Sequence, residues 1–261
     1  MLELRDLVKH YRVGEGDPIR AVDGVRMAVA PGEFVALYGP SGSGKTTLLE
    51  LIAGIAQPDA GSVLLDGRDI FAFTRRERDE YRLRELGIIG QPQNLIPGAR
   101  AIENASLKLW LTNKRQARHA IEPLLGRLGL GDRLLHRTEQ LSMGERQRVL
   151  IAMALSTEPK LVLADEPTGT LDTQRTREVL GLLREVCRER GAAVVLATHD
   201  PQAAAYADQV HELRDGRLQP YRPEPAVEFA GPRVEPAEPR VSPSERNDEP
   251  AEPEPFSEAR A

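Results

Sequence analysis

One nine-residue stretch carries the residue types that bind a nucleotide phosphate. It fits the pattern G-x-x-x-x-G-K-[ST], with Lys45 and Thr46 near its end. In such a P-loop, backbone N–H groups of a glycine-rich turn point at phosphate oxygens, the lysine reaches the β- and γ-phosphates, and the threonine hydroxyl binds Mg2+. The members of the stretch are Gly39, Pro40, Ser41, Gly42, Ser43, Gly44, Lys45, Thr46 and Thr47.

The segments on either side of the loop support this interpretation. Residues 34–38 form a short apolar run that predicts a buried strand, and residues 47–53 predict a helix that begins near Lys45. The N-terminal end of the helix dipole then faces the same anion as the loop. The alternative is a surface turn rich in glycine and serine, which would not need a strand before it and a helix after it.

An acidic pair follows a second apolar run. Residues 161–164 predict a strand that ends at Asp165 and Glu166. As a Walker B carboxylate, Asp165 would hold Mg2+ through water, and Glu166 could polarise an attacking water. Such a pair can also cap a helix, but after a P-loop at this distance the sequence favours catalysis.

A third candidate lies between these two motifs. Ser142 and Glu145 predict a capping box at the start of a helix, and Ser142 with Gly144 leaves helix N–H groups open to an anion. The stretch resembles Leu-Ser-Gly-Gly-Gln, the signature of the ATP-binding cassette family. Met143 and Glu145 depart from that signature, whereas Ser142 and Gly144, which supply most of the phosphate contacts in the family, are kept.

The resemblance covers roughly residues 2–218 and implies roles for four further residues. Tyr11 looks like the aromatic that stacks on adenine, and Gln91 like the Q-loop glutamine that senses Mg2+ and the attacking water. Asp172 resembles the D-loop aspartate that crosses the dimer interface, and His199 the switch histidine that contacts the γ-phosphate. The structural alternatives are an edge-of-core tyrosine, a polar loop residue, a helix cap and a structural histidine.

The resemblance also implies a mechanism and partners. Two copies would pack head to tail with ATP and Mg2+ between the P-loop of one and the signature turn of the other, hydrolyse ATP to ADP and phosphate, and drive an integral membrane permease subunit. The apolar Leu95, Ile96 and Trp110 could line a groove for a short helix of that partner, and a core position for Trp110 is equally open. The expected location is cytoplasmic and peripheral, on the inner face of the cell membrane.

Within the family, three segments look most like one branch: residues 94–97, 103–104 and 165–169. This branch contains macrolide-export, lipoprotein-release and cell-division ATPases, mechanotransmitters that act on periplasmic or extracellular events. A cell-division ATPase that controls a wall hydrolase through its membrane partner is therefore an alternative. A DNA-repair or ribosome-associated ATPase of the family is less favoured, since the sequence has no visible coiled-coil or zinc insertion.

Composition excludes other classes of protein. The 261-residue chain has a net charge of -5. The excess acid lies in residues 220–261, which leaves a formally neutral body without the basic field that nucleic-acid binding needs. The single cysteine, Cys187, excludes an intrachain disulfide and suits a reducing compartment. We expect neither a signal peptide nor a membrane-spanning segment.

The order of the elements predicts how these residues are positioned. Strands alternate with helices, which predicts an α/β fold with a mostly parallel sheet covered on both faces, the core of a P-loop NTPase. An antiparallel β subdomain opens the nucleotide-binding domain, residues 1–219, and an α-helical subdomain is inserted at about residues 92–158. Residues 220–261 are rich in proline and glutamate and predict a disordered tail.

Overall fold

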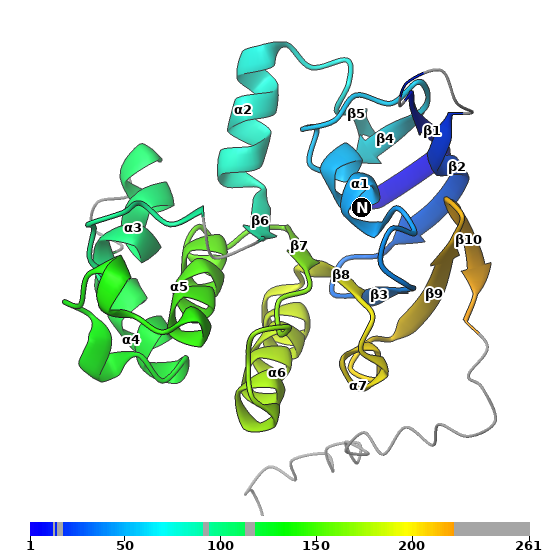
Figure 1. Ribbon diagram of the computed structural model, residues 1–261. Helices are drawn as coiled ribbons and strands as arrows, with labels where there is room; N and C mark the ends of the chain where they lie inside the picture. The colour runs from blue at the N-terminus through cyan, green and yellow to red at the C-terminus, as the bar shows by residue number, and fades with distance from the viewer. Residues whose placement is uncertain (13, 15–17, 91–93, 113–117, 222–261) are drawn as a thin grey trace, which may run out of the picture. The chain divides into compact units, whose positions relative to one another are not determined.

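Figure 1 shows the computed structural model of the chain, which describes residues 1–12, 14, 18–90, 94–112 and 118–221. The strands in these residues agree with the predicted α/β class, and the strands predicted at residues 34–38 and 161–164 are present as β3 and β7. Their bounds are Leu2–Tyr11 (β1), Ile19–Val29 (β2), Phe34–Tyr38 (β3), Ala60–Leu65 (β4), Arg68–Asp69 (β5), Leu86–Ile89 (β6), Leu161–Asp165 (β7), Ala193–Thr198 (β8), Gln209–Arg214 (β9) and Arg217–Pro220 (β10).

The helices alternate with the strands as predicted. The α-helices of the described residues are Lys45–Ile52 (α1), Arg75–Arg84 (α2), Ala101–Leu111 (α3), Arg118–Arg127 (α4), Met143–Leu155 (α5), Thr173–Arg190 (α6) and Pro201–Ala204 (α7). Short 3-10 turns occur at Gly131–Arg133 and Thr138–Gln140. The helices α3 to α5 fall within the predicted helical subdomain. Of the predicted tail, Pro220 belongs to β10, and residues 222–261 lie outside the described residues.

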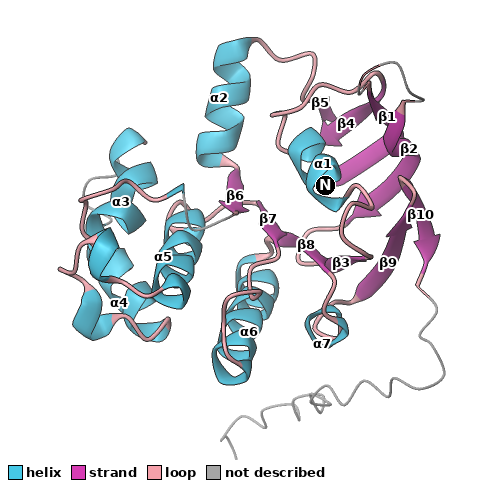
Figure 2. Ribbon diagram, viewed as in Figure 1, coloured by secondary structure: helices cyan, strands magenta, loops and turns pink. Residues whose placement is uncertain are grey.

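Two sheets organise the described residues (Figure 2). The first is antiparallel and has the order β2-β1-β4-β5. The second has the order β10-β9-β3-β8-β7-β6, in which all neighbours are parallel except β10 and β9. An antiparallel N-terminal sheet and a mostly parallel core sheet are what the sequence predicts.

Alternation along the core strands builds a hydrophobic core on each face of the second sheet. In β7, Val162 and Ala164 join the core that contains α3 to α6, while Leu161 and Leu163 join the core that contains α1. Successive side chains of a strand point to opposite faces, so one five-residue strand contributes to both cores. The predicted coverage of the sheet on both faces is confirmed.

The second half of α2 is fastened to the end of α1. The Tyr81 hydroxyl donates a hydrogen bond to the Ile52 carbonyl at 2.9 Å, and Arg82 Nη1 donates to the Gly54 carbonyl at 3.0 Å. Tyr81 is fully buried, and burial raises the pKa of its hydroxyl. The phenol therefore stays protonated and remains a hydrogen-bond donor at neutral pH.

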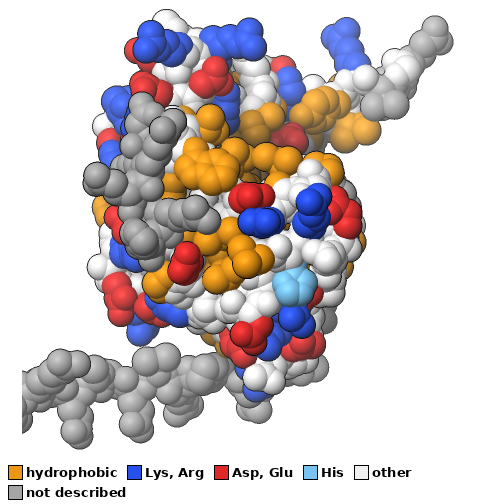
Figure 3. Space-filling view, turned by 90° about the vertical axis from the view of Figure 1, so that its left-hand side faces the viewer, with side chains coloured by type: hydrophobic (Ala, Val, Ile, Leu, Met, Phe, Trp, Pro, Cys, Tyr) orange, Lys and Arg blue, Asp and Glu red, His pale blue; other side chains and the backbone are white. Residues whose placement is uncertain are grey.

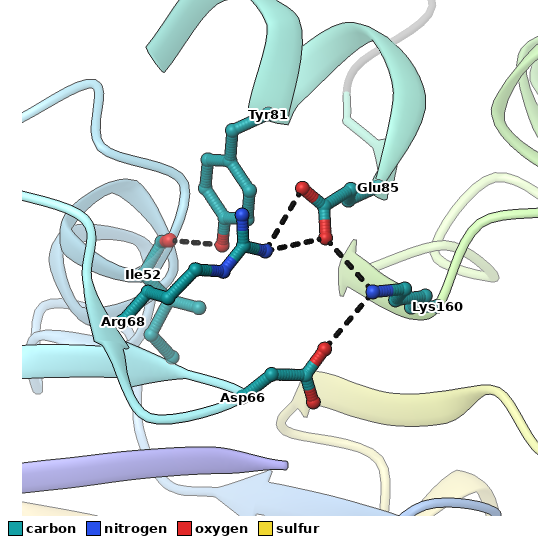
Figure 4. A network of polar contacts seen from close by, with 6 residues as sticks. All are labelled: Ile52, Asp66, Arg68, Tyr81, Glu85 and Lys160. Atoms are coloured by element: carbon teal, nitrogen blue, oxygen red, sulfur yellow. Dashed lines mark hydrogen bonds and ion pairs between the residues drawn. The ribbon is translucent and has the colours of Figure 1, made fainter. Parts of the chain in front are cut away.

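A charged network extends this attachment to the first sheet (Figure 4). Arg68 Nη2 donates to both carboxylate oxygens of Glu85, at 3.1 and 2.9 Å. Lys160, which precedes β7, donates to Asp66 at 2.9 Å and lies 3.2 Å from Glu85. The end of α2, the β4–β5 turn and the start of β7 are thereby held together.

The helix α3 is joined to the core sheet by a buried lysine. Lys108 Nζ donates a hydrogen bond to the carbonyl of Leu86, the first residue of β6. Burial lowers the pKa of Lys108 to about 8, because a charged ammonium is costly to remove from water. This attachment positions α3 beside the strand that leads to residue 91.

A buried amide fixes the loop before α3. Asn104 Oδ1 accepts a hydrogen bond from the Ile96 N–H at 2.8 Å, and its Nδ2 donates to Thr138 Oγ1 at 3.2 Å. The loop is thereby drawn inward, and Leu95 is 4% exposed and packs in the core. The prediction that Leu95 lines a surface groove is wrong. Trp110, by contrast, is 42% exposed, which excludes the core position.

Candidate nucleotide-binding and catalytic site

The P-loop follows β3 and leads into α1, as the sequence predicts. Gly44 stands before α1 with φ of 104°, a conformation that residues with a Cβ rarely adopt. A Cβ on Gly44 would lie 1.9 Å from the Ala21 carbonyl oxygen, and one on Gly39 would lie 2.4 Å from that of Leu213. The backbones of β2 and β9 thus form the back wall of the loop, against which only glycine fits.

Two polar side chains inside the loop suit an anion. Lys45 Nζ donates hydrogen bonds to the carbonyls of Gly39 at 2.7 Å and Pro40 at 3.0 Å. Burial lowers the pKa of Lys45, and the carboxylates at the end of β7 partly oppose this effect. The buried hydroxyl of Ser43 has no hydrogen-bond partner within the described residues and can donate to a phosphate oxygen. The loop therefore fits the phosphates of a nucleotide.

The order of the core sheet brings the separate motifs to one edge. The strands β3, β8 and β7 are neighbours and run parallel. Ala197 lies opposite Asp165, and Thr198 lies opposite the last residue of β3. The P-loop, Glu166 and His199 therefore follow adjacent strand ends. Ligands of open α/β sheets bind at this carboxyl edge.

Thr46 and Asp165 are in direct contact. Thr46 Oγ1 donates a hydrogen bond to Asp165 Oδ2 at 2.8 Å, although the two residues are 119 positions apart. Hydroxyl and carboxylate oxygens are ligands that Mg2+ takes together with water and substrate phosphates. No cluster of three or more His, Cys, Asp or Glu that could hold a metal occurs in the described part of the chain. The donor set fits a Mg2+ that is completed by nucleotide, not one enclosed by protein alone.

Glu166 and His199 contact each other beside this pair. His199 Nδ1 lies 2.7 Å from Glu166 Oε1, and Thr198 Oγ1 lies 3.5 Å from Glu166 Oε2. The Glu166 N–H donates to the Ala197 carbonyl at 3.0 Å, and Glu166 has a left-handed φ of 46°. Strain of this kind is concentrated at functional sites. The contacts orient a carboxylate that can accept a proton from water.

The signature turn has a structural role of its own. Ser142 Oγ accepts a hydrogen bond from the Glu145 N–H at 3.2 Å, and Glu145 Oε2 accepts one from the Ser142 N–H at 2.8 Å, so the predicted capping box is confirmed. A Cβ on Gly144 would lie 3.1 Å from Leu171 Cδ2. Close packing is thus one reason for glycine there. Met143, which replaces the first signature glycine, is 47% exposed.

The remaining predicted residues lie at the ends of other elements. Tyr11 ends β1 and is 38% exposed, with Lys9 Nζ 5.4 Å from its ring centroid. Asp172 Oδ1 accepts a hydrogen bond from the Arg175 N–H at 2.9 Å, which confirms that Asp172 caps α6. Gln91 lies outside the described residues.

Apart from Tyr11 and Gln91, the predicted residues outside the glycine-rich turn form two groups. Within the described residues, no hydrogen bond or ion pair joins one group to the other. The first group, at the edge of the core sheet, contains Lys45, Thr46, Asp165, Glu166 and His199. The second group, at the starts of α5 and α6, contains Ser142, Gly144 and Asp172.

The sequence reasoning missed a contact that connects α5 to the core sheet. Gln147 is buried, and its Nε2 donates a hydrogen bond to the Gly90 carbonyl at 3.2 Å, immediately before residue 91. Helical spacing places Gln147 on the same face as the apolar Leu150 and Ile151. A polar residue at an apolar position of a helix is the signal that could have found it.

Comparison with known proteins decides which class of P-loop protein this is. Residues 22–169 match the family model described as ABC transporter. The chain belongs to this family. It is an ABC cassette that binds ATP and hydrolyses it in a reaction coupled to transport.

Two kinds of cassette are similar to this ABC protein. It is 45% identical over 221 residues to the lipoprotein-releasing system ATP-binding protein LolD 2 of Caulobacter vibrioides, covering 84% of this chain and 96% of that one. It is 43% identical over 220 residues to the macrolide export ATP-binding/permease protein MacB of Rhodopirellula baltica, covering 83% of this chain but 32% of MacB. The predicted closeness to lipoprotein-release and macrolide-export ATPases is confirmed.

Solved structures agree with the assignment. The dimeric structure of MJ0796, described as a bacterial ABC transporter cassette, has a TM-score of 0.79 at 34% identity and covers 84% of this chain and 97% of that one. A post-hydrolysis state of the same cassette, bound to ADP and Pi, has a TM-score of 0.77 at 33% identity. The ABC fold is therefore shown. In the described part of the chain, no helix is long and apolar enough to span a membrane.

Proposed function

We propose that two copies of this ABC cassette clamp ATP and Mg2+ between them and drive a membrane-embedded permease subunit. The observation that carries the proposal is the meeting of three strand ends, where Thr46 bonds to Asp165 and Glu166 bonds to His199. A phosphate loop, a metal-binding pair and an oriented carboxylate are the parts that hydrolysis of a nucleoside triphosphate requires.

The separation of the two groups of site residues supports a dimer. Among the described residues of one copy, the signature turn at Ser142 and Gly144 has no hydrogen bond to the phosphate loop, but its helix N-terminus suits an anion. In a head-to-tail pair, each signature turn would face the nucleotide held by the other copy. Asp172, at the start of α6, would lie near the same interface. The similar cassette MJ0796 was solved as a dimer.

Each residue of the first group has a chemical task. The N–H groups of residues 39–47 and the Lys45 ammonium would bind the phosphates, and Tyr11 would stack on adenine. Thr46, Asp165 and Gln91 would hold Mg2+, which neutralises phosphate charge when bound. Glu166 would accept a proton from the attacking water, and His199 would orient Glu166 and contact the γ-phosphate. The 2.8 Å contact between Thr46 and Asp165 and the 2.7 Å contact between His199 and Glu166 support the tasks proposed for these four residues.

A cleft beside the site suits a helix of the permease. It has a volume of about 150 Å3 and is lined by apolar residues of α1 and β6 next to Thr46 and Asp165. Figure 3 shows hydrophobic side chains gathered on the face that carries α3. Trp110 of α3 is exposed, as is Ile96 in the loop before this helix. An amphipathic helix docks into such surfaces through its apolar face. The position of the permease helix would depend on the bound nucleotide, because Thr46 and Asp165 of the metal-binding pair also line the cleft.

The relatives suggest where this partner lies. LolD 2 is named as the ATP-binding protein of a lipoprotein-releasing system, and MacB joins an ATP-binding and a permease part in one name. We propose that the present cassette lies on the inner face of the cell membrane, bound to a permease subunit that resembles the permease part of MacB.

The Glu166→Gln variant tests the proposal. The amide keeps the size of the side chain but cannot accept the proton, so ATP hydrolysis should fall by about a hundredfold or more. Since binding is spared, the variant should elute as a dimer with Mg-ATP and as a monomer without nucleotide. Phosphate release and size-exclusion chromatography measure the two effects.

Glu189→Gln provides the matched control, because Glu189 is an exposed acid at the C-terminal end of α6, opposite the end that Asp172 caps. It should hydrolyse ATP at the wild-type rate. A Glu166→Gln variant that hydrolyses ATP normally while remaining monomeric would exclude both the catalytic and the dimer assignments.

A further inference from the structure

Three arginines in the first turn of α2 lack partners in the described structure. Arg75, Arg76 and Arg78 take part in none of its hydrogen bonds or ion pairs through their side chains. The other two arginines of the helix form ion pairs within α2. The unpaired charge is therefore confined to one end of the helix.

This charge has no evident structural purpose. The N-terminal end of a helix carries a positive partial charge, so cations there are unfavourable, and acids are the stabilising choice. Glu77 already supplies the favourable acid by completing a capping box with Thr74. The opposite end of α2 is fastened through Tyr81 and Glu85 (Figure 4). The arginines thus extend from a helix whose stability does not depend on them.

Arg78, one of the three, lies close to the cleft assigned to the permease. A Cβ on Gly54 would be 3.7 Å from Arg78 Cδ, and the following residue, Ile55, is 60% exposed and lines the cleft. Figure 3 shows Lys and Arg side chains at the top of this face, at the height of the first turn of α2 in Figure 1, above the hydrophobic patch. The surface assigned to the permease is therefore continuous with a basic surface.

We propose that Arg75, Arg76 and Arg78 bind the headgroups of anionic phospholipids in the membrane that holds the permease. This proposal rests on the proposed function, because the cleft faces the membrane only if it binds the permease. A guanidinium binds phosphate through paired hydrogen bonds, and cytoplasmic leaflets attract basic segments. The chain as a whole has a net charge of -5, so a general attraction to an anionic surface is not expected, and binding would require this local cluster.

Co-sedimentation with vesicles tests the surface. The full chain is mixed at low salt with vesicles of phosphatidylcholine alone, or of equal parts phosphatidylcholine and phosphatidylglycerol. We expect partition into the second kind only, weakening as salt is raised. One arginine near an anionic surface raises the partition coefficient about fivefold. The R75A/R76A/R78A variant should therefore partition about a hundredfold less.

A matched variant, R177A/R188A/R214A, removes three exposed arginines from α6 and β9 and should partition as the wild type does. ATP hydrolysis measured without vesicles should be unchanged in both variants, and the Tm of the α2 variant should be equal or higher. Equal partition of the two variants would overturn the proposal. Absence of partition into lipid alone would overturn it in favour of an acidic protein segment. If ATP is not hydrolysed but partition is kept, the proposed function fails and the lipid surface stands.

Discussion

Lys108 gives the cassette a measurable dependence of stability on pH. Its pKa is about 8 in the folded chain, against an ordinary value of 10.5 for a lysine in water. The folded state therefore prefers the neutral amine. Below pH 8 the folded state carries the full cost of a buried ammonium. This cost declines as pH rises from 8 to 10.5 and is absent above that range, so the Lys108 contribution to the free energy of unfolding increases with pH.

The magnitude follows from the difference between the two pKa values. At 1.36 kcal/mol per unit, the cost at pH 7 is about 3 kcal/mol, and most of it is relieved by pH 10. Lys108→Met retains the apolar stem and removes the titration, but it also loses the hydrogen bond to the Leu86 carbonyl, worth about 1 kcal/mol. The variant should therefore be more stable than the wild type at pH 7 by about 2 kcal/mol and lose this advantage by pH 10.

Urea unfolding of wild type and variant at pH 7 and pH 10 measures this difference, because titrations common to both chains cancel. Lys160→Met is the control, and this variant should be less stable than the wild type at pH 7. Its hydrogen bonds to Asp66 and Glu85 raise the pKa of Lys160, so the stability that they supply is present below the unfolded pKa and lost only at higher pH. A Lys108 variant whose advantage is equal at both pH values would refute a buried, titrating lysine.

Two further substitutions test the site itself. Thr46→Val keeps the shape of the side chain but removes the hydroxyl that contacts Asp165. The Mg2+ concentration that gives half-maximal ATP hydrolysis should rise about tenfold. A Mg2+ titration that matches the wild type would contradict the metal assignment. Gly44→Ala places a Cβ 1.9 Å from the Ala21 carbonyl oxygen and should abolish nucleotide binding in equilibrium dialysis. Gly67→Ala, with the same left-handed strain but open space around it, should cost only about 1 kcal/mol and keep binding; equal loss in both would contradict the steric explanation.

Local patterns predicted the elements of this fold well. A buried strand, a glycine-rich turn and a helix are contiguous in sequence, so their order around Lys45 could be deduced from spacing alone. The capping roles of Ser142 and Asp172 are also local, since each side chain bonds to an N–H three residues further on.

Contacts between distant segments could not be predicted in the same way. Thr46 meets Asp165 because β8 lies between β3 and β7, and a list of parallel strands does not state which are neighbours. Leu95 looked like a surface residue of a loop, but the amide of Asn104 draws that loop into the core. The partner of Lys108 is a backbone carbonyl. Every residue has one, so the sequence does not indicate which carbonyl Lys108 contacts.

The back wall of the phosphate loop consists of main-chain atoms from two strands that flank the nucleotide core, at Ala21 and Leu213. A substitution can alter either side chain, yet the carbonyl that bounds the loop remains. The shape of the phosphate loop therefore does not depend on most single substitutions in the residues around it. It is vulnerable to events that displace a whole strand, such as a shift in register or an insertion within β2 or β9.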